Sequence, residues 1–545
     1  MILAAWGSDR RWLRRLPSGA TTLEGTGWTL AFAGEGRAFA DDAVMLGTSL
    51  SDGRHLGELG GGYCVARVRD GLELGRGPAW SPPLYYVCRR DGVIASSRLE
   101  LLVEDERPDL GRLASLLTYC LGQDDDRTAF EGVRRVRPFE MLTTRGPRVE
   151  RRPGIVRVAQ APRAPADELA HRLRTELDLA TASAARGHAK VAVMVGGIDS
   201  CSVLASASTV GPLAVTLDLR GPGADLPYVT SLARRLSLAC EVVTPEACRP
   251  LVAPHLVVDA APAIHTGDAL ELGCAARARA LGATVLLSGN GGDEVFGGDF
   301  GAAYAMLARR GAAHRVLRGL RAPLPWSPTR RQRVREIVAS VARPAVPAWL
   351  RRLRARVSER RWYSWIGPIA RRELAVLRRA PANIPSPWSA QDRYDALARS
   401  PRIGQGAEER EQMGIASGLR RVDVPFDDRL VRFVCALPPD ALFEGDAYRG
   451  LLRRAMRDAL PADILARDDK AEFEVATAAL MMPLPPDLLE FRRLARTGLI
   501  DRAEMLREIR PVLDTPTSHE AAFLWGTVSA AIAIERFLEL RGVTA

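Results

Sequence analysis

The stretch KVAVMVGGIDSCSVLASAS, residues 190–208, decides the fold of this chain. Its apolar run VAVMV is continuous, which is typical of a strand buried on both faces of a parallel sheet. The strand ends near Met194, glycines follow at positions 196 and 197, and a helix then begins near Cys201. This order of strand, glycine turn and helix predicts an α/β domain.

The same order recurs in PLAVTLDLRGPGADLPYVTSLARRLSL, residues 212–238, and in GATVLLSGNGGDEVFGGDF, residues 282–300. Helices between parallel strands imply right-handed βαβ crossovers. The carboxyl ends of these strands then lie on one edge of the sheet, where open α/β sheets bind their ligands.

The first glycine turn is suited to an anion. Gly196 and Gly197 let the backbone approach a phosphate closely, and the following helix offers unpaired N–H groups. Asp199 would repel a bare phosphate, so its place here makes sense if Mg²⁺ lies between them. A double glycine between strand and helix is also common for packing reasons, and this motif alone is weak evidence.

The second glycine turn, residues 288–298, supplies another carboxylate, Asp293, after another apolar strand. Asp199 and Asp293 together suggest a pair of acidic ligands for a nucleotide-bound magnesium ion. Helix-capping acids would explain each turn separately. They would not explain why both acids fall on one predicted sheet edge.

The first 150 residues have a different texture, with short apolar runs broken by glycine-containing turns at residues 69–71 and 90–92. This pattern predicts a β-rich domain. A segment rich in Pro and Ala follows at residues 153–165, and we place the linker there, between domains at 1–155 and 165–545. Beyond about residue 300 the pattern is mostly helical.

A helix is expected from about Pro165 to Ala185. Four leucines supply its apolar stripe: Leu169, Leu173, Leu177 and Leu179.

The charge of the chain is concentrated in one segment. The formal charge is +11, and residues 309–361 alone hold sixteen arginines against two glutamates. Such a segment could hold nucleic acid or an acidic peptide. It lacks the interleaved aromatic residues of a single-strand binding surface, which favours a solvated helical face and makes nucleic acid an unlikely partner.

Lysine is almost absent, because Lys190 and Lys470 are the two lysines among 76 basic residues. Neither stands in a GK[ST] context, so the chain is not a P-loop NTPase. Arginine evidently serves wherever a generic positive charge suffices. Lys470 is therefore expected to need its compact ammonium, and Lys190, just before the first sheet strand, to have a structural role at the far end of that strand.

These motifs resemble, in order, those of the asparagine synthetase family. Residues 195–200 are similar to its SGGxDS pyrophosphate loop, 289–298 to its GDGGDELFGG motif, 424–428 to its VPFLD segment, and 448–470 to its closing helix and lysine. The resemblance implies an N-terminal β-rich sandwich like the Ntn glutaminases, followed by an α/β ATP-pyrophosphatase domain with a helical C-terminal part. It also implies ATP and Mg²⁺ as cofactors.

The resemblance further implies roles for individual residues. The metal ligands would be Asp199 and Asp293. The catalytic residues would be Lys470, Asn290 and Asp293. The ATP and pyrophosphate site would comprise Val195, Gly196, Gly197, Asp199, Ser200, Leu217 and Gly289.

Four features depart from the family pattern, and the first three bear on the reaction. A working glutaminase of this family needs cysteine after Met1, and this chain has Ile2, so the amine should come from another substrate. Asn290 stands where relatives carry an acid or a tyrosine, and an amide is not a general base. Arg421 and Asp423 occupy the family's E-x-R pattern, which puts a conventional acid–base dyad in doubt. Val195 also replaces the first serine of the loop.

A member without glutaminase activity resembles either the β-lactam synthetases or the cyclases of lasso peptides. We favour the cyclase, which adenylates an Asp or Glu side chain of a precursor peptide and joins it to the peptide's N-terminal amine. The arginine-rich segment with Trp362, Tyr363 and Trp365 could line the large cavity that this needs, although core packing explains each aromatic residue equally well. A small-molecule β-lactam-type cyclase and an amide ligase that does not use glutamine remain alternatives.

The expected partners are the precursor peptide and a leader peptidase or leader-recognition protein of the same pathway. The longest uncharged apolar run, residues 521–534, is too short to span a bilayer. The start lacks a secretory signal, and the eight cysteines are scattered without a CxxC pair. We expect a cytoplasmic protein. Another hypothesis is a pseudoenzyme that kept the fold without the activity, and the retained Asp199, Asp293 and Lys470 argue against it.

Overall fold

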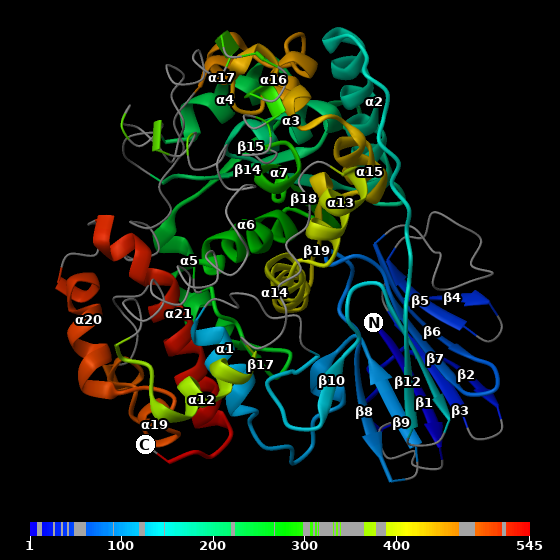
Figure 1. Cartoon of the computed structure of the whole chain (residues 1–545), viewed down its shortest axis with the longest axis vertical. Helices are drawn as coiled ribbons and strands as arrows, with labels where there is room; N and C mark the ends of the chain where they lie inside the picture. The colour runs from blue at the N-terminus through cyan, green and yellow to red at the C-terminus, as the bar shows by residue number, and fades with distance from the viewer. Residues whose placement is uncertain are drawn as a thin grey trace.

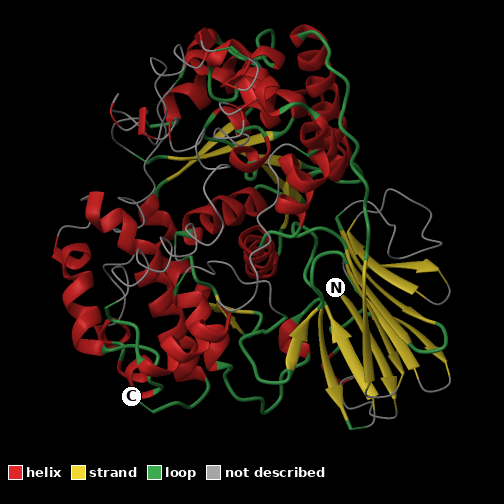
Figure 2. Cartoon of the chain, in the orientation of Figure 1, coloured by secondary structure: helices red, strands yellow, loops and turns green. Residues whose placement is uncertain are grey.

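In the computed structural model the chain forms an N-terminal β-sandwich and a larger α/β and helical part (Figures 1 and 2). The structure describes residues 1–7, 14–25, 28–33, 36–40, 43–47, 62–90, 92–118, 126–145, 148–219, 224–265, 267–297, 364–377, 389–467, 486–514 and 519–544, with short stretches between 303 and 338.

The predicted β-rich domain consists of two six-stranded antiparallel sheets, with strand orders β10-β8-β9-β1-β3-β2 and β12-β11-β7-β6-β5-β4. The strands are β1 (Ile2–Gly7), β2 (Thr21–Gly25), β3 (Trp28–Phe32), β4 (Arg37–Ala40), β5 (Ala43–Gly47), β6 (Tyr63–Val68), β7 (Leu72–Arg76), β8 (Tyr85–Arg89), β9 (Gly92–Ser96), β10 (Val133–Arg135), β11 (Glu140–Arg145) and β12 (Arg148–Pro153). Alternate residues of both sheets fill the space between them, and Ile2 is fully buried in that core.

The hairpin turn predicted at residues 69–71 joins β6 to β7, and the one at 90–92 falls between β8 and β9. The connection after β12 leads to helix α2 (Ala166–Ala185), with Pro165 at its N-cap. Leu169, Leu173 and Leu177 are buried as expected, but Leu179 is 45% exposed. Two residues rotate a helix by about 200°, so Leu179 faces away from the stripe that ends at Leu177.

The predicted parallel sheet has the order β15-β14-β13-β18-β19. Its strands are β13 (Val191–Met194), β14 (Leu213–Leu217), β15 (Cys240–Val243), β18 (Val285–Ser288) and β19 (Arg420–Asp423). Alternate residues of the central strands enter two different cores, so both faces are covered. One face packs against α2, α3 (Ile198–Ala207) and α4 (Leu226–Arg235), and the other against α6 (Asp268–Ala280) and α14 (Pro401–Ser417).

The other elements are mostly helices, and beyond residue 300 this agrees with the predicted helical pattern. Its elements include α1 (Leu110–Leu117), α5 (Pro245–His255), the short β16 (Val257–Val258) and β17 (Ala261–Pro262), α7 (Gly292–Val295), α12 (Pro368–Leu377), α13 (Ala390–Ala398), α15 (Asp428–Ala436), α16 (Gly450–Ala455), α17 (Ala462–Ala466), α19 (Arg492–Arg496), α20 (Arg502–Asp514) and α21 (His519–Leu540). No helix in the described ranges is long and apolar enough to cross a bilayer.

The two parts share a continuous core. Helix α1 packs on α12 and α21, and the Phe130 and Phe537 rings meet edge to face at 5.4 Å. Trp365 packs in this core, with 2% of its surface exposed. Trp362, Tyr363 and most of the arginine-rich segment lie outside the described residues.

A second link between the two parts is a buried carboxylate in the turn between β16 and β17. Asp259 accepts hydrogen bonds from the backbone N–H groups of Leu99 (2.8 Å) and Glu100 (3.2 Å) and pairs with Arg98 at 3.0 Å. Burial raises the pKa of Asp259 to about 6.

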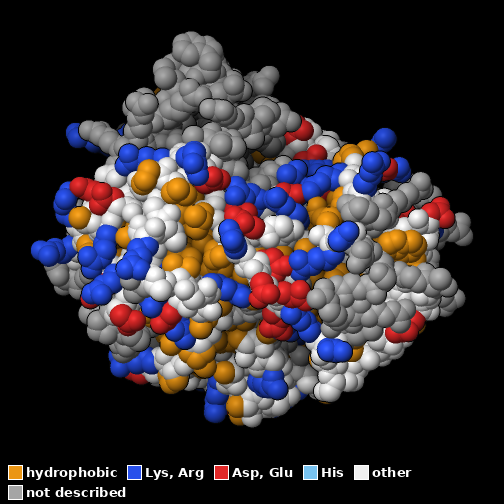
Figure 3. All heavy atoms as spheres, turned by 90° about the horizontal axis from the view of Figure 1, so that it is seen from below, with side chains coloured by type: hydrophobic (Ala, Val, Ile, Leu, Met, Phe, Trp, Pro, Cys, Tyr) orange, Lys and Arg blue, Asp and Glu red, His pale blue; other side chains and the backbone are white. Residues whose placement is uncertain are grey.

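On the face shown in Figure 3, basic and acidic side chains of the described residues lie interspersed. Many arginines form ion pairs, as Arg454 and Arg457 do with Asp167.

Candidate active site

The two glycine turns meet at the carboxyl edge of the sheet. Strands β13 and β18 are parallel neighbours, with Met194 opposite Ser288, so the turns that follow them begin side by side. A Cβ added to Gly289 would lie 2.3 Å from the backbone nitrogen of Ser200, and one added to Gly292 would lie 2.3 Å from the Asp199 side chain. Glycine is therefore required at both positions for the turns to pack together.

Helix α3 begins at Ile198, three residues earlier than the sequence suggests, with Gly197 at its N-cap. The Ser200 hydroxyl explains the early start, because it accepts a hydrogen bond from the Gly196 N–H (2.8 Å) and donates one to the Gly197 carbonyl (2.9 Å). Asp199 and Ser200 consequently lie in the first turn of the helix, where its dipole favours an anion.

The two predicted metal ligands converge on one point. Arg449 Nη2 lies 2.7 Å from Asp199 Oδ2 and also pairs with Asp293 Oδ1, while the Tyr448 hydroxyl donates to the same Asp293 oxygen at 3.1 Å. Arg449 precedes α16 with a φ of 56°, a left-handed conformation that is uncommon for a residue other than glycine. A cation already bridges the carboxylates in this arrangement.

This geometry fits Mg²⁺. The ion favours oxygen ligands, is commonly held by one or two carboxylates, and takes its other ligands from water and substrate phosphates. The position between Asp199 and Asp293 that the Arg449 nitrogen occupies is within reach of both carboxylates, so an ion placed there would have two carboxylate ligands.

The closing segment reaches the first turn through a buried ion pair. Arg467 Nη1 lies 2.5 Å from Asp225 Oδ1, and the Arg467 guanidinium lies over the Tyr228 ring at 4.4 Å. Asp225 in turn lies against Gly196, where an added Cβ would be 2.6 Å from Asp225 Oδ2. Lys470, three positions after Arg467 in the sequence, lies outside the described residues.

The other predicted residues are distributed around these turns. Val195 continues the pairing of β13 with β14 through a 2.8 Å hydrogen bond to Val215, and its side chain is buried. Leu217 ends β14 with its side chain in the core. At the opposite end of the sheet, Lys190 Nζ donates to the Leu281 carbonyl at 2.7 Å.

Asn290 faces a group of charged residues, of which sequence reasoning missed Glu271. Its amide Nδ2 donates to Glu271 Oε1 of α6 at 3.3 Å, and the other Glu271 oxygen pairs with Arg421 of β19. Arg421 also contacts Asp423 at 3.2 Å, and Asp423 accepts a 2.5 Å hydrogen bond from Ser288. The departure noted at Arg421 and Asp423 therefore belongs to an ion-pair chain that ends beside Asn290.

Further carboxylates lie near the ion pairs of Arg421. Burial, together with the negative charges of Glu409 and Glu271, raises the pKa of Asp268 well above its ordinary value. Burial also raises the pKa of Glu409, whose Oε2 lies 3.5 Å from His265 Nε2.

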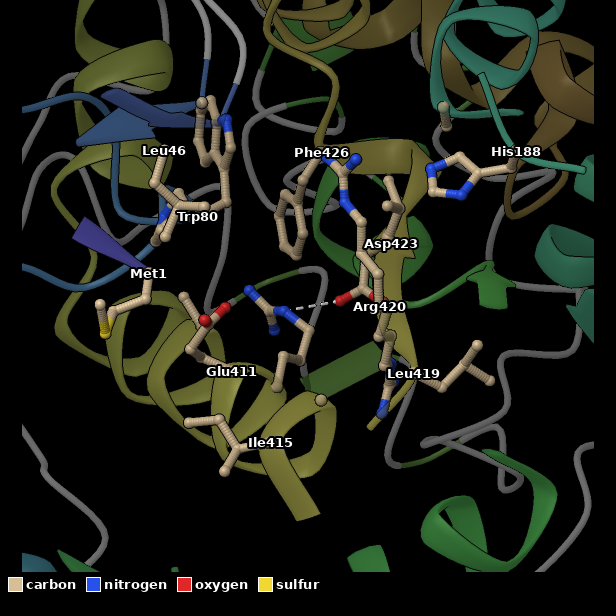
Figure 4. A pocket seen from close by; sticks show the side chains of 18 of the residues that line it. Met1, Leu46, Trp80, His188, Glu411, Ile415, Leu419, Arg420, Asp423 and Phe426 are labelled. Carbon is tan, nitrogen blue, oxygen red and sulfur yellow. Dashed lines mark hydrogen bonds and ion pairs between the residues drawn. The ribbon is translucent and has the colours of Figure 1, made fainter. Parts of the chain in front are cut away.

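A cavity of about 1060 Å³ lies between the sandwich and the α/β part (Figure 4). Its walls include residues of both parts: Met1, Leu46, Trp80, Glu411, Ile415, Leu419, Arg420, Asp423 and Phe426. Trp80 stacks on Phe426 with ring centroids 5.6 Å apart. Of the described residues that line it, none belongs to either glycine turn, so the cavity and the converging aspartates are separate features.

A comparison with protein families gives a match. The asparagine synthase family matches residues 172–535, which include both glycine turns, Arg421 and Arg449. A search of curated proteins gave no significant match. Members of the matched family are ATP-dependent ligases that form carbon–nitrogen bonds. Because the match covers more than half of the chain, this protein belongs to the asparagine synthase family.

Proposed function

We propose that this ATP-dependent amide-forming ligase adenylates an Asp or Glu side chain of a precursor peptide. It then joins that carbonyl to the N-terminal amine of the same peptide, which closes a macrolactam ring of the lasso peptide type. The convergence of Asp199 and Asp293 beside the two glycine turns carries the ATP-dependent half of the proposal. Bound Mg²⁺ would neutralise phosphate charge there and assist the departure of pyrophosphate.

The chain's own residues divide the remaining work. The N–H groups at the start of α3 bind phosphate oxygens, and Arg449 offers a further cation when Mg²⁺ takes its place between the aspartates. The Arg467–Asp225 pair fixes the segment that leads to Lys470. The Lys470 ammonium would stabilise charge on the tetrahedral intermediate and the departing adenylate.

The N-terminal sandwich supports a source of amine other than glutamine. We regard it as a glutaminase-like domain without activity, because Ile2 offers no nucleophile and its side chain is fully buried. A leader peptidase or leader-recognition protein would deliver the precursor.

The test is ATP–pyrophosphate exchange with a linear synthetic peptide that has a free N-terminal glycine and an internal glutamate. Exchange should depend on the peptide, and the product should have lost one water. Acetylation of the N-terminus should preserve exchange and abolish ring closure. Replacement of the glutamate by glutamine should abolish both. Exchange with small amino acids but not with such peptides would instead favour a small-molecule ligase.

A further inference from the structure

Formation of an amide requires a group that accepts the proton of the attacking amine. Asn290 cannot do so, because an amide is not basic, and Arg421 stays protonated at any working pH. Glu271 is in contact with both of these side chains. It comes from α6, 19 residues before Asn290 in the sequence, and no motif of the chain contains it.

We propose that Glu271 is the catalytic base that takes the proton from the amine as it attacks the acyl-adenylate. The inference rests on the proposed function and names the residue for its second half-reaction. The geometry of three side chains, Asn290, Glu271 and Arg421, carries it.

The Glu271 carboxylate is held at one oxygen and can accept a proton at the other. Oε2 is occupied by the Arg421 guanidinium, whereas Oε1 accepts one long hydrogen bond from Asn290, at 3.3 Å. A carboxylate oxygen has room for a second donor. An amine that reached Oε1 would thus lie beside Asn290. Asn290 belongs to the same glycine turn as Asp293.

Exposure distinguishes Glu271 from the residues behind it. Its side chain is 19% exposed, against 4% for Arg421 and 2% for Asp423. Asp423 is further fixed by Ser288 and by Arg410 at 2.8 Å. The buried residues therefore hold Glu271 in place, and Glu271 is the one that a substrate can touch.

The neighbouring Asp268, one turn earlier on α6, is less suited to the role. Burial and the adjacent carboxylates raise its pKa, which favours the protonated form. A protonated acid cannot accept the amine proton.

The step balances as follows. The amine nitrogen attacks the acyl carbon and forms the C–N bond, and its proton passes to Glu271 Oε1. The bond from the acyl carbon to the adenylate oxygen then breaks, and AMP leaves with the electron pair.

The experiment compares Glu271→Gln with wild type, using the peptide with a glycine amine and an internal glutamate. Glutamine keeps the shape and the contact with Asn290 but is not basic. We expect ring closure to fall by about 10²-fold or more, while ATP–pyrophosphate exchange changes little. Hydroxylamine, which is uncharged near neutral pH and needs no base, should trap the acyl-adenylate equally well in both proteins.

Glu241→Gln is the matched control. Glu241 lies on edge strand β15 and pairs at 2.7 Å with Arg277 of α6, the helix that also carries Glu271. The control variant should close rings as wild type does. Thermal unfolding of each variant checks the fold. Glu271→Asp keeps the carboxylate charge on a shorter side chain, farther from the amine, and should show intermediate ring closure.

Normal ring closure by Glu271→Gln would overturn the inference. Equal loss of exchange and hydroxamate formation would also overturn it, because Glu271 would then serve adenylation or the fold. Absence of exchange in wild type with any carboxylate would instead refute the proposed function itself.

Discussion

Removal of either aspartate charge at the sheet edge tests the central feature of the site. Asp199→Asn and Asp293→Asn each keep the side-chain shape and remove one of the two carboxylates that converge on Arg449. Both variants should lose the ability to hold Mg²⁺ against the ATP phosphates. We expect ATP–pyrophosphate exchange to fall by about 10²-fold or more in each.

The effects on stability should differ. Asp199 is 14% exposed and Arg449 is 11% exposed, whereas Asp293 is 49% exposed. Loss of a buried partner costs about 3–5 kcal/mol when the remaining charge has no other partner. Arg449 keeps Asp293 in the Asp199→Asn variant, so we expect about 1–2 kcal/mol there. The half-exposed Asp293 should contribute only about 0–1 kcal/mol.

The assay is exchange as a function of Mg²⁺ concentration, together with thermal unfolding of the same preparations. Asp167→Asn is the control, because Asp167 also pairs with two arginines near α16 but lies on the exposed surface. It should retain exchange. Normal turnover by both site variants at the wild-type Mg²⁺ requirement would refute the assignment of these aspartates. A larger loss of stability in Asp293→Asn would refute the argument from burial.

Three further predictions concern other parts of the chain. Lys470→Arg should impair product formation about 10²-fold or more, whereas Lys190→Arg, at the far end of the sheet, should be nearly normal; equal activities would leave Lys470 without a special role. Glutamine hydrolysis, assayed as ammonia release, should stay at background because Ile2 is not a nucleophile, and ammonia release that depends on the purified chain would contradict this. Asp259 has its pKa raised to about 6 in the folded state, so its contribution to stability is full below about pH 4 and declines as the pH rises through 6; urea unfolding should show this decline in wild type and not in Asp259→Asn.

Local sequence patterns predict the parallel sheet and the two aspartates of the candidate site. The apolar runs before the two glycine turns predict adjacent buried strands, and the handedness of βαβ units sends both strand ends to one edge. The rule places Asp199 and Asp293 at the same edge, because the turns that follow parallel strands all lie at the carboxyl edge of the sheet. The glycines at 289 and 292 are needed where the turns pack against each other.

The tertiary structure alone decided which charged residues complete the site. Arg449 is 156 residues from Asp293, and Glu271 is 150 residues from Arg421. Neither arginine nor glutamate is distinctive in a chain with so many charges, and no periodic pattern links positions so far apart. The pairing depends on how α6 and α16 pack around the sheet edge.

Burial likewise depends on packing that no short pattern encodes. Trp365 could be assigned to a cavity wall or to the core from its sequence context, and it lies in the core. Leu179 is apolar and near the stripe of α2, yet it points to solvent because the rotation of the helix, and not the residue type, selects the buried face. The local sequence therefore determines the strand ends and the acids that follow them, whereas the contacts that hold those acids arise only when distant helices meet.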